Sequence, residues 1–111
     1  MLLPNPGRAV VDLAKLKDYC LDPSDEDGKH KARVFVTALG IQQRDAAWLR
    51  ERLLAAVHFD AQPLAKINFG ALYMIDFQLR NAHGEAVVRS GWIVRTGEDF
   101  PRLTTCFVVR R

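Results

Sequence analysis

The spacing of apolar residues changes near Pro63, and this change limits the folds that are open to the chain. Before Pro63, apolar side chains recur every three or four residues, as on one face of an amphipathic helix. After it, apolar and polar side chains alternate, as in a strand with one buried face. Helices followed by strands indicate an α+β fold, with N-terminal helices packed on one face of a C-terminal antiparallel β-meander.

The length of 111 residues fits one domain, and the chain has no linker or internal repeat. We expect a single domain over 1–111. It consists of an extended arm over 1–11, a helical part over 12–58 and an antiparallel sheet over 64–109. With 49% apolar and 26% charged residues, the chain can form a core without a disulfide, a metal ion or a cofactor, and none is predicted.

Charge and targeting signals narrow the partners and the compartment. The formal net charge of +3 permits an anionic partner without requiring one. No stretch approaches the ~18 apolar residues of a membrane span. The first seven residues are too short and too rich in proline for a secretion signal. We therefore expect a cytoplasmic protein that does not bind a membrane.

Three helices are predicted in the helical part, at about 13–21, 29–39 and 45–58. Asp12 is suited to cap the first helix, and Asp45 to cap or open the third. Gly40 is suited to end the second, because glycine readily takes the left-handed conformation found after a helix. The β-branched run at 34–37 leaves a strand as the alternative for the second helix.

Four strands are predicted after Pro63, at about 64–68, 72–80, 87–94 and 103–109. Gly91 interrupts the third of them and predicts a bulge or bend. Helices and strands together define a core. The residues expected to be largely buried are Phe35, Leu39, Trp48, Leu49, Leu53, Ile75, Phe77, Trp92, Val94 and Phe107.

Two features could suggest a metal site, and neither supports one. The acidic loop at 22–28 lacks the alternating acids and the final glutamate of a calcium loop. Its acids instead favour the positive end of the following helix. Cys20 and Cys106 stand alone in apolar surroundings, without zinc-type spacing, and are expected to be reduced core residues.

A basic run at the start of the second helix, Gly28-Lys29-His30-Lys31-Ala32-Arg33, is the first candidate site. An imidazole such as that of His30 can take and give a proton near neutral pH. The cations beside it would attract a phosphate. The alternative is an exposed histidine at a helix start that has no role.

The second candidate lies around the last turn of the sheet. Strand alternation places Arg102 and Thr104 on one face and Thr105 on the other. If the last two strands pair, Arg95 or Thr96 lies near Arg102 or Thr104, and such a cluster could stabilise phosphoryl transfer. The alternative is structural, because threonine favours strands and arginine often guards strand ends.

Several segments resemble a bacterial domain family of unknown function. They are Leu16 with Tyr19-Cys20-Leu21-Asp22-Pro23, Gly28 to Phe35, Ala38-Leu39-Gly40-Ile41, Gly84, Trp92, and Pro101-Arg102-Leu103-Thr104-Thr105. The similarity covers about 12–108. Members of that family occur as small standalone proteins and at the C-terminus of phage-head-morphogenesis and polymorphic-toxin proteins. The resemblance implies no established activity.

A weaker, fold-level resemblance is to the metal-independent nucleases of the barnase, EndoU, colicin and RelE type. It implies a general acid or base at His30, phosphate contacts from Lys29, Lys31 and Arg102, and a hydroxyl from Thr105. Many of these toxins have a tyrosine near the end of the last strand. Here the nearest aromatic residue is Phe107.

The leading hypothesis is a metal-independent, ribonuclease-like and toxin-related domain that cleaves RNA phosphodiesters. The assigned catalytic residues are His30, Lys31 and Thr105, and the phosphate-binding residues are Lys29, Arg33, Arg95, Thr96 and Arg102. The alternative is a non-catalytic binding module, such as the partner of a small neighbouring protein in a toxin–antitoxin or toxin–immunity pair. A structural domain without a site is the third hypothesis. An enzyme requires these groups to converge in one concave site.

Overall fold

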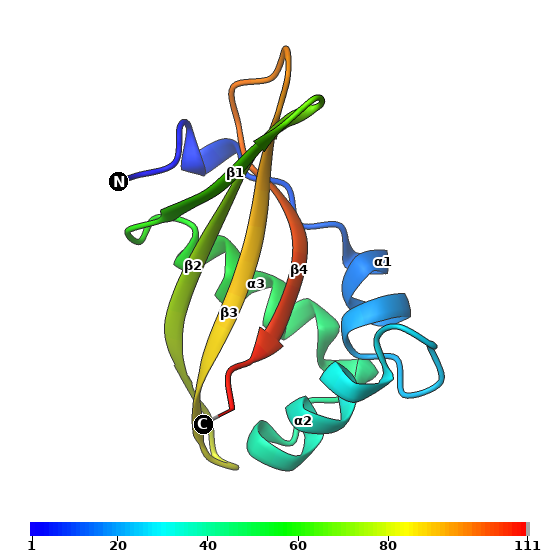
Figure 1. The fold of residues 1–111 in the computed structure, drawn as a ribbon. Helices are drawn as coiled ribbons and strands as arrows, with labels where there is room; N and C mark the ends of the chain where they lie inside the picture. The colour runs from blue at the N-terminus through cyan, green and yellow to red at the C-terminus, as the bar shows by residue number, and fades with distance from the viewer. Residues whose placement is uncertain (111) are drawn as a thin grey trace.

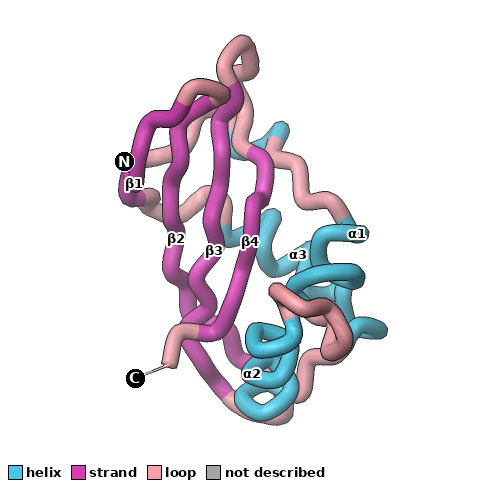
Figure 2. Tube along the Cα trace, turned by 45° about the vertical axis from the view of Figure 1, so that its right-hand side comes forward, coloured by secondary structure: helices cyan, strands magenta, loops and turns pink. Residues whose placement is uncertain are grey.

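The computed structural model describes residues 1–110. The helical elements are η1 (Pro6–Arg8), α1 (Leu13–Lys15), η2 (Leu16–Cys20), α2 (Lys29–Leu39), η3 (Gln43–Asp45) and α3 (Ala46–Ala56). The strands are β1 (Gln62–Ile67), β2 (Gly70–Arg80), β3 (Glu85–Arg95) and β4 (Arg102–Val108). Helices precede strands and lie on one side of the sheet, so the predicted α+β fold is confirmed (Figures 1 and 2).

The sheet is an antiparallel meander in the order β1-β2-β3-β4. Strand β1 begins at Gln62, earlier than the predicted start at 64, and therefore includes Pro63. Proline is tolerated there because β1 is an edge strand, where one row of backbone groups needs no partner. At the opposite edge of the sheet, Val10 of the N-terminal arm forms a parallel bridge with Arg102 of β4.

The first helix differs from the predicted single helix over 13–21. Asp12 caps it as expected, since its carboxylate accepts a hydrogen bond from the backbone N–H of Ala14 at 2.9 Å. After Lys15 the turn widens into the π-helical segment η2, where Leu21 N–H donates to the carbonyl of Leu16 at 2.8 Å. The wider turn helps Leu16 and Cys20, four residues apart, to reach the core together.

Helix α2 has the predicted bounds, so the strand alternative is wrong. At its start, Gly28 lies so close to the backbone of Tyr19 that a Cβ would overlap the Tyr19 carbonyl. At its end, Gly40 takes the left-handed conformation with φ of 64°. Ile41 N–H then donates to the Phe35 carbonyl at 3.2 Å and closes the helix in the manner of a Schellman turn.

The core lies between the helices and the inner face of the sheet. Trp92 is fully buried, and its indole N–H donates to the Ser90 hydroxyl at 2.9 Å. That hydroxyl donates in turn to the Ile75 carbonyl at 2.9 Å. Both side chains thus keep their hydrogen bonds inside an apolar core, where an unpaired polar group would be costly.

Three of the residues expected in the core lie elsewhere. Trp48 is 40% exposed, because the buried stripe of α3 runs through Leu49 and Leu53 and leaves Trp48 about 100° around the helix. Val94 and Phe107 are only partly buried. The other seven residues are buried as predicted. The errors therefore concern residues at the edge of the core.

A bulge in β4 changes which side chains share a face. Gly91 pairs with Thr105 and Trp92 with Leu103, so Thr104 is the extra residue. The bulge was predicted at Gly91, but its extra residue belongs to β4. The predicted strict alternation of side chains between the two faces of β4 is therefore wrong. The buried positions of β4 are Leu103, Cys106 and Val108. Within residues 1–110, no helix is long and apolar enough to cross a bilayer.

Candidate functional site

The arginines at the β3–β4 turn surround a carboxylate of the protein itself. The guanidinium of Arg102 donates two hydrogen bonds, each of 2.9 Å, to the two carboxylate oxygens of Glu98. These bonds, together with the charges of Arg102 and Arg95, hold the pKa of Glu98 below its usual range. Thr96 lies exposed at the same turn. The structure thus brings Arg95 and Arg102 together, but around Glu98.

Two of the residues predicted to be catalytic lie against the core. Lys31 donates to the Tyr19 hydroxyl at 3.1 Å, and its ammonium lies 5.7 Å from the centroid of the Phe107 ring. The hydroxyl oxygen of Thr105 is buried and has no hydrogen bond of ordinary geometry within the described chain. Hydrogen bonding from Cys106, with contributions from Thr105 and Lys31, lowers the pKa of Cys20 to about 7. Lys31 is therefore held by an aromatic hydroxyl, and the Thr105 hydroxyl is enclosed in the protein.

His30 does not share a cleft with the arginines of the sheet. It is exposed at the start of α2, next to Lys31. From Phe107, which Lys31 approaches, Arg102 is five residues back along β4, or roughly 16 Å. In Figure 1 the β3–β4 turn stands at the top of the sheet and α2 at the bottom. The predicted residues therefore fall into separate groups.

The acidic loop before α2 uses its carboxylates to fold itself. Asp22 accepts hydrogen bonds from the backbone N–H of Ser24 at 2.9 Å and from its hydroxyl at 2.7 Å, and both lower the pKa of Asp22. Asp25 accepts from the N–H of Gly28 at 2.7 Å and so stabilises the start of α2, as expected. Residues 1–110 contain no group of three or more metal-ligating side chains placed to hold an ion.

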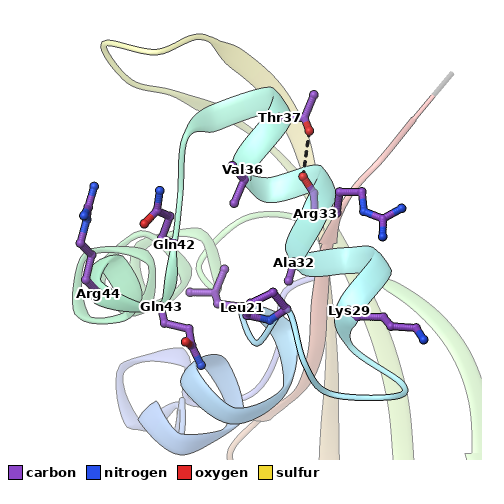
Figure 3. A pocket seen from close by; sticks show the side chains of 10 residues that line it. Leu21, Lys29, Ala32, Arg33, Val36, Thr37, Gln42, Gln43 and Arg44 are labelled. Atoms are coloured by element: carbon purple, nitrogen blue, oxygen red, sulfur yellow. Dashed lines mark hydrogen bonds between the residues drawn. The ribbon is translucent and has the colours of Figure 1, made fainter.

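Lys29 and Arg33 line a groove of about 640 Å³ that the sequence analysis did not anticipate (Figure 3). They are four residues apart on α2, so they lie on the same face of the helix. Figure 3 shows the apolar side chains of Ala32, Val36 and Leu21 between them and the segment that follows α2. Val36 is 41% exposed in this groove and leaves apolar surface at its centre.

The opposite flank of the groove comes from the segment after Gly40. The left-handed turn there reverses the chain, so that Gln42, Gln43 and Arg44 return beside α2. Gln43 fixes this flank by donating to the Lys17 carbonyl at 2.6 Å. Asp45 accepts from the Gln42 N–H at 2.9 Å in a capping box at the start of η3, which leads into α3.

The cations of the groove are less neutralised than those of the β3–β4 turn. Lys29 has only a distant pair, with Glu26 at 3.5 Å. Arg33 and Arg44 form no ion pair with any residue in 1–110. The groove thus has an arginine without an ion pair in residues 1–110 on each flank.

Comparison with known proteins supplies a family for the whole described chain. A family model described as "Domain of unknown function (DUF6883)" matches residues 2–110. The chain belongs to this family. No curated protein and no solved structure matches it. The DUF6883 assignment agrees with the predicted membership of a family of unknown function.

The half of the groove that follows α2 was not predicted from the sequence. No role was predicted for Gln42, Gln43 or Arg44. The signal was present at Gly40, because a helix closed by a left-handed glycine directs the next residues back along its own side. Lys29 and Arg33 were identified as anion-binding candidates, but on the assumption that their partners came from the sheet.

Proposed function

We propose that this domain is a non-catalytic binding module whose groove takes an acidic, amphipathic segment of a small partner protein. The proposal rests on one observation about the groove. Apolar side chains form its centre, Lys29 and Arg33 stand on one flank, and Arg44 stands on the other. A segment with apolar side chains between acidic ones complements this order of charges.

The size of the groove suits a short extended segment. From Lys29 to Thr37 the helix rises about 12 Å, which equals roughly four residues of extended chain. Acidic side chains at either end of such a segment would pair with arginines on both flanks, while an apolar side chain would cover Val36. Because few residues are buried, we expect weak, reversible binding, typical of transient regulatory contacts.

RNA is a poorer match to the groove than an acidic protein segment. Sites for single-stranded RNA stack bases on aromatic side chains, and the residues that line this groove include none. The ribonuclease hypothesis, with His30 as its proton carrier, stays a prediction, as do the toxin-related role and the cytoplasmic location. A cognate neighbouring protein is the partner that the groove favours.

The test compares three labelled probes by fluorescence polarisation. The first is a ten-residue peptide in which leucine and valine alternate with aspartate and glutamate. The second carries lysine in place of every acid, and the third is a ten-nucleotide oligouridylate. We expect the acidic peptide alone to bind, with Kd on the order of 10–100 μM. The variant Val36→Glu, which adds a carboxylate at the groove centre, should abolish this binding.

Other results would overturn the proposal. Equal binding of the lysine peptide would show that charge complementarity is absent. RNA cleavage in EDTA that His30→Ala abolishes would establish the ribonuclease hypothesis instead. Retention of full peptide affinity by Val36→Glu would place the binding outside the groove.

A further inference from the structure

Strand β2 is longer than the strand beside it, so part of its outer edge has no strand partner. β1 pairs with β2 only from Gly70 to Met74, whereas β3 pairs with β2 without interruption from Gly70 to Arg80. Figures 1 and 2 show that β1 lies beside only the upper part of β2. Within residues 1–110, no strand lies beyond the stretch from Asp76 to Arg80 on the side away from β3.

The hydrogen-bond pattern of the sheet shows which backbone groups point to this open edge. The Val87 carbonyl accepts from the Val109 N–H at 2.9 Å, on the β4 side, so it is directed away from Gln78 of β2. Residues of an antiparallel ladder bond alternately to one neighbouring strand and to the other. The N–H and C=O groups of Asp76, Gln78 and Arg80 therefore point away from β3, and β1 does not reach them.

This edge lacks the features that hinder strand pairing at the other edges of the sheet. β1 contains Pro63 and an irregular register after it. The edge of β4 is covered by Val10, whose N–H donates to the Pro101 carbonyl at 2.9 Å. From 75 to 80, β2 has neither a proline nor a break in its register. The stretch is therefore open to a further strand.

A hollow of about 250 Å³ lies beside the same stretch, between β2 and α3. Two large aromatic side chains line it and are nevertheless exposed, Trp48 by 40% and Phe59 by 53%. Ala55 and Ala56 contribute only methyl groups to its wall. A bulky apolar side chain placed next to Phe77 would fill this space and cover both rings.

The guanidinium of Arg52 gives the hollow a positive charge. It lies 5.9 Å from the centroid of the Trp48 ring and forms no ion pair with any residue in 1–110. Arg80, the other cation that lines the hollow, is already paired with Glu85. An acidic group beside the bulky side chain would therefore meet a cation that has no internal partner.

We propose that an extended segment of a partner protein adds to the sheet as a strand beside residues 76–80. Its backbone exchanges hydrogen bonds with the open edge, and one large apolar side chain enters the hollow between Trp48 and Phe59. An acidic residue of the segment pairs with Arg52. The hollow and the groove on α2 share no lining residue, so this is a second docking surface.

The test uses a seven-residue labelled peptide in which threonine alternates with valine. Tryptophan replaces the central valine, and glutamate replaces the last threonine. Two isomers are N-methylated on alternate residues, one along each edge of the strand, so that they carry identical side chains. In fluorescence polarisation we expect the two isomers to differ in affinity by about 10-fold or more, because only one of them blocks the hydrogen bonds to β2.

Variants of the hollow locate the bound peptide. Trp48→Ala and Phe59→Ala should each weaken binding roughly 5-fold, because each removes a ring that contacts the ligand. The matched variant Phe69→Ala, whose ring is 66% exposed at the β1–β2 turn, should bind like the parent. The peptide should also slow hydrogen exchange at the Gln78 amide. The Leu79 amide, which bonds to β3, should change less.

Three outcomes would contradict strand addition. The two methylated isomers could bind equally, as they would if side chains alone were recognised. An oligouridylate could compete with the peptide and lose its affinity in Trp48→Ala, which would assign the rings to base stacking. The free protein could form a dimer that Trp48→Ala dissociates, which would make a second copy of the chain the occupant.

Discussion

The domain has two clusters of cations, one at the β3–β4 turn and one at the groove, and the two differ in how their arginines are paired. At the β3–β4 turn, Arg95 and Arg102 flank Glu98, and two hydrogen bonds join Arg102 to that carboxylate. At the groove, Arg33 and Arg44 flank apolar side chains and pair with no residue in the described chain. We therefore propose that an anion binds where the cations lack an internal partner, since a paired guanidinium has already bound its carboxylate.

The largest expected effect concerns the packing that holds the groove. Phe35→Ala removes a fully buried side chain that anchors α2, and it should lower the free energy of unfolding by ~3–5 kcal/mol. The neighbouring substitution Val36→Ala, at a side chain 41% exposed in the groove, should cost less than ~1 kcal/mol. Urea denaturation measures both. A cost below ~1 kcal/mol for Phe35→Ala would mean that α2 does not hold the groove rigidly.

A second prediction converts the paired cluster into an open one. Glu98→Gln removes the carboxylate between Arg95 and Arg102 and should create a new site for the acidic peptide at this end of the sheet. Because exposed ion pairs are weak, we expect a gain of roughly 2–5-fold in affinity over background there. Chemical-shift changes of β3 and β4 residues, followed by nuclear magnetic resonance, would show whether the peptide binds at this end of the sheet. An unchanged affinity and no shift at these strands would show that pairing does not control the site.

The charge of Lys29 is neutralised less than that of the paired Arg102 and more than that of Arg33, which has no ion pair within residues 1–110. The reason is that the ion pair of Lys29 with Glu26 is long, at 3.5 Å. Lys29→Met should weaken the acidic peptide by only about 2-fold, which is less than the loss of an unpaired arginine. Glu26→Gln, which frees the ammonium, should strengthen binding by a similar factor. Polarisation titrations of the two variants check the sign. If both variants changed the peptide affinity in the same direction, the ion pair with Glu26 would not control the binding strength of Lys29.

The smallest effect is on the titration of Glu98. Arg102 lowers the pKa of this carboxyl below its ordinary value of 4.5. The pair therefore stabilises the fold fully above pH 4.5, and the contribution is lost as pH falls through the lower folded value. Carbon-detected nuclear magnetic resonance should give a titration midpoint for Glu98 below 4.5 in the parent protein. In Arg102→Met the midpoint should return toward 4.5. A parental midpoint at or above 4.5 would exclude the pair in solution.

Local patterns in the sequence predicted the fold well. The bounds of α2, the cap at Asp12, the end at Gly40 and the antiparallel order of the strands all follow from rules that act within a few residues. Trp48 was misplaced because apolar character alone does not say which face of a helix meets the sheet. The register of β4 was misjudged because the extra residue, Thr104, depends on the partner strand.

The candidate site was predicted only in part, because it depends on how distant elements pack. Lys29 and Arg33 were predicted to bind phosphate, and the structure shows only that both line the groove. Arg95 and Arg102, predicted as possible neighbours, both act on Glu98. No local pattern indicates that Glu98 binds Arg102 or that Arg44 returns beside α2. Each of these contacts joins segments whose relative position is set by the turn, the bulge or the core between them.

The most direct test compares two double variants that remove the same charge. Arg33→Ala with Arg44→Ala and Arg95→Ala with Arg102→Ala each lower the net charge by two, so nonspecific attraction falls equally. By fluorescence polarisation with the acidic peptide, the groove variant should lose roughly 5–10-fold in affinity and the sheet variant less than about 2-fold. Equal losses, or a larger loss for the sheet variant, would contradict the assignment of the site to the groove.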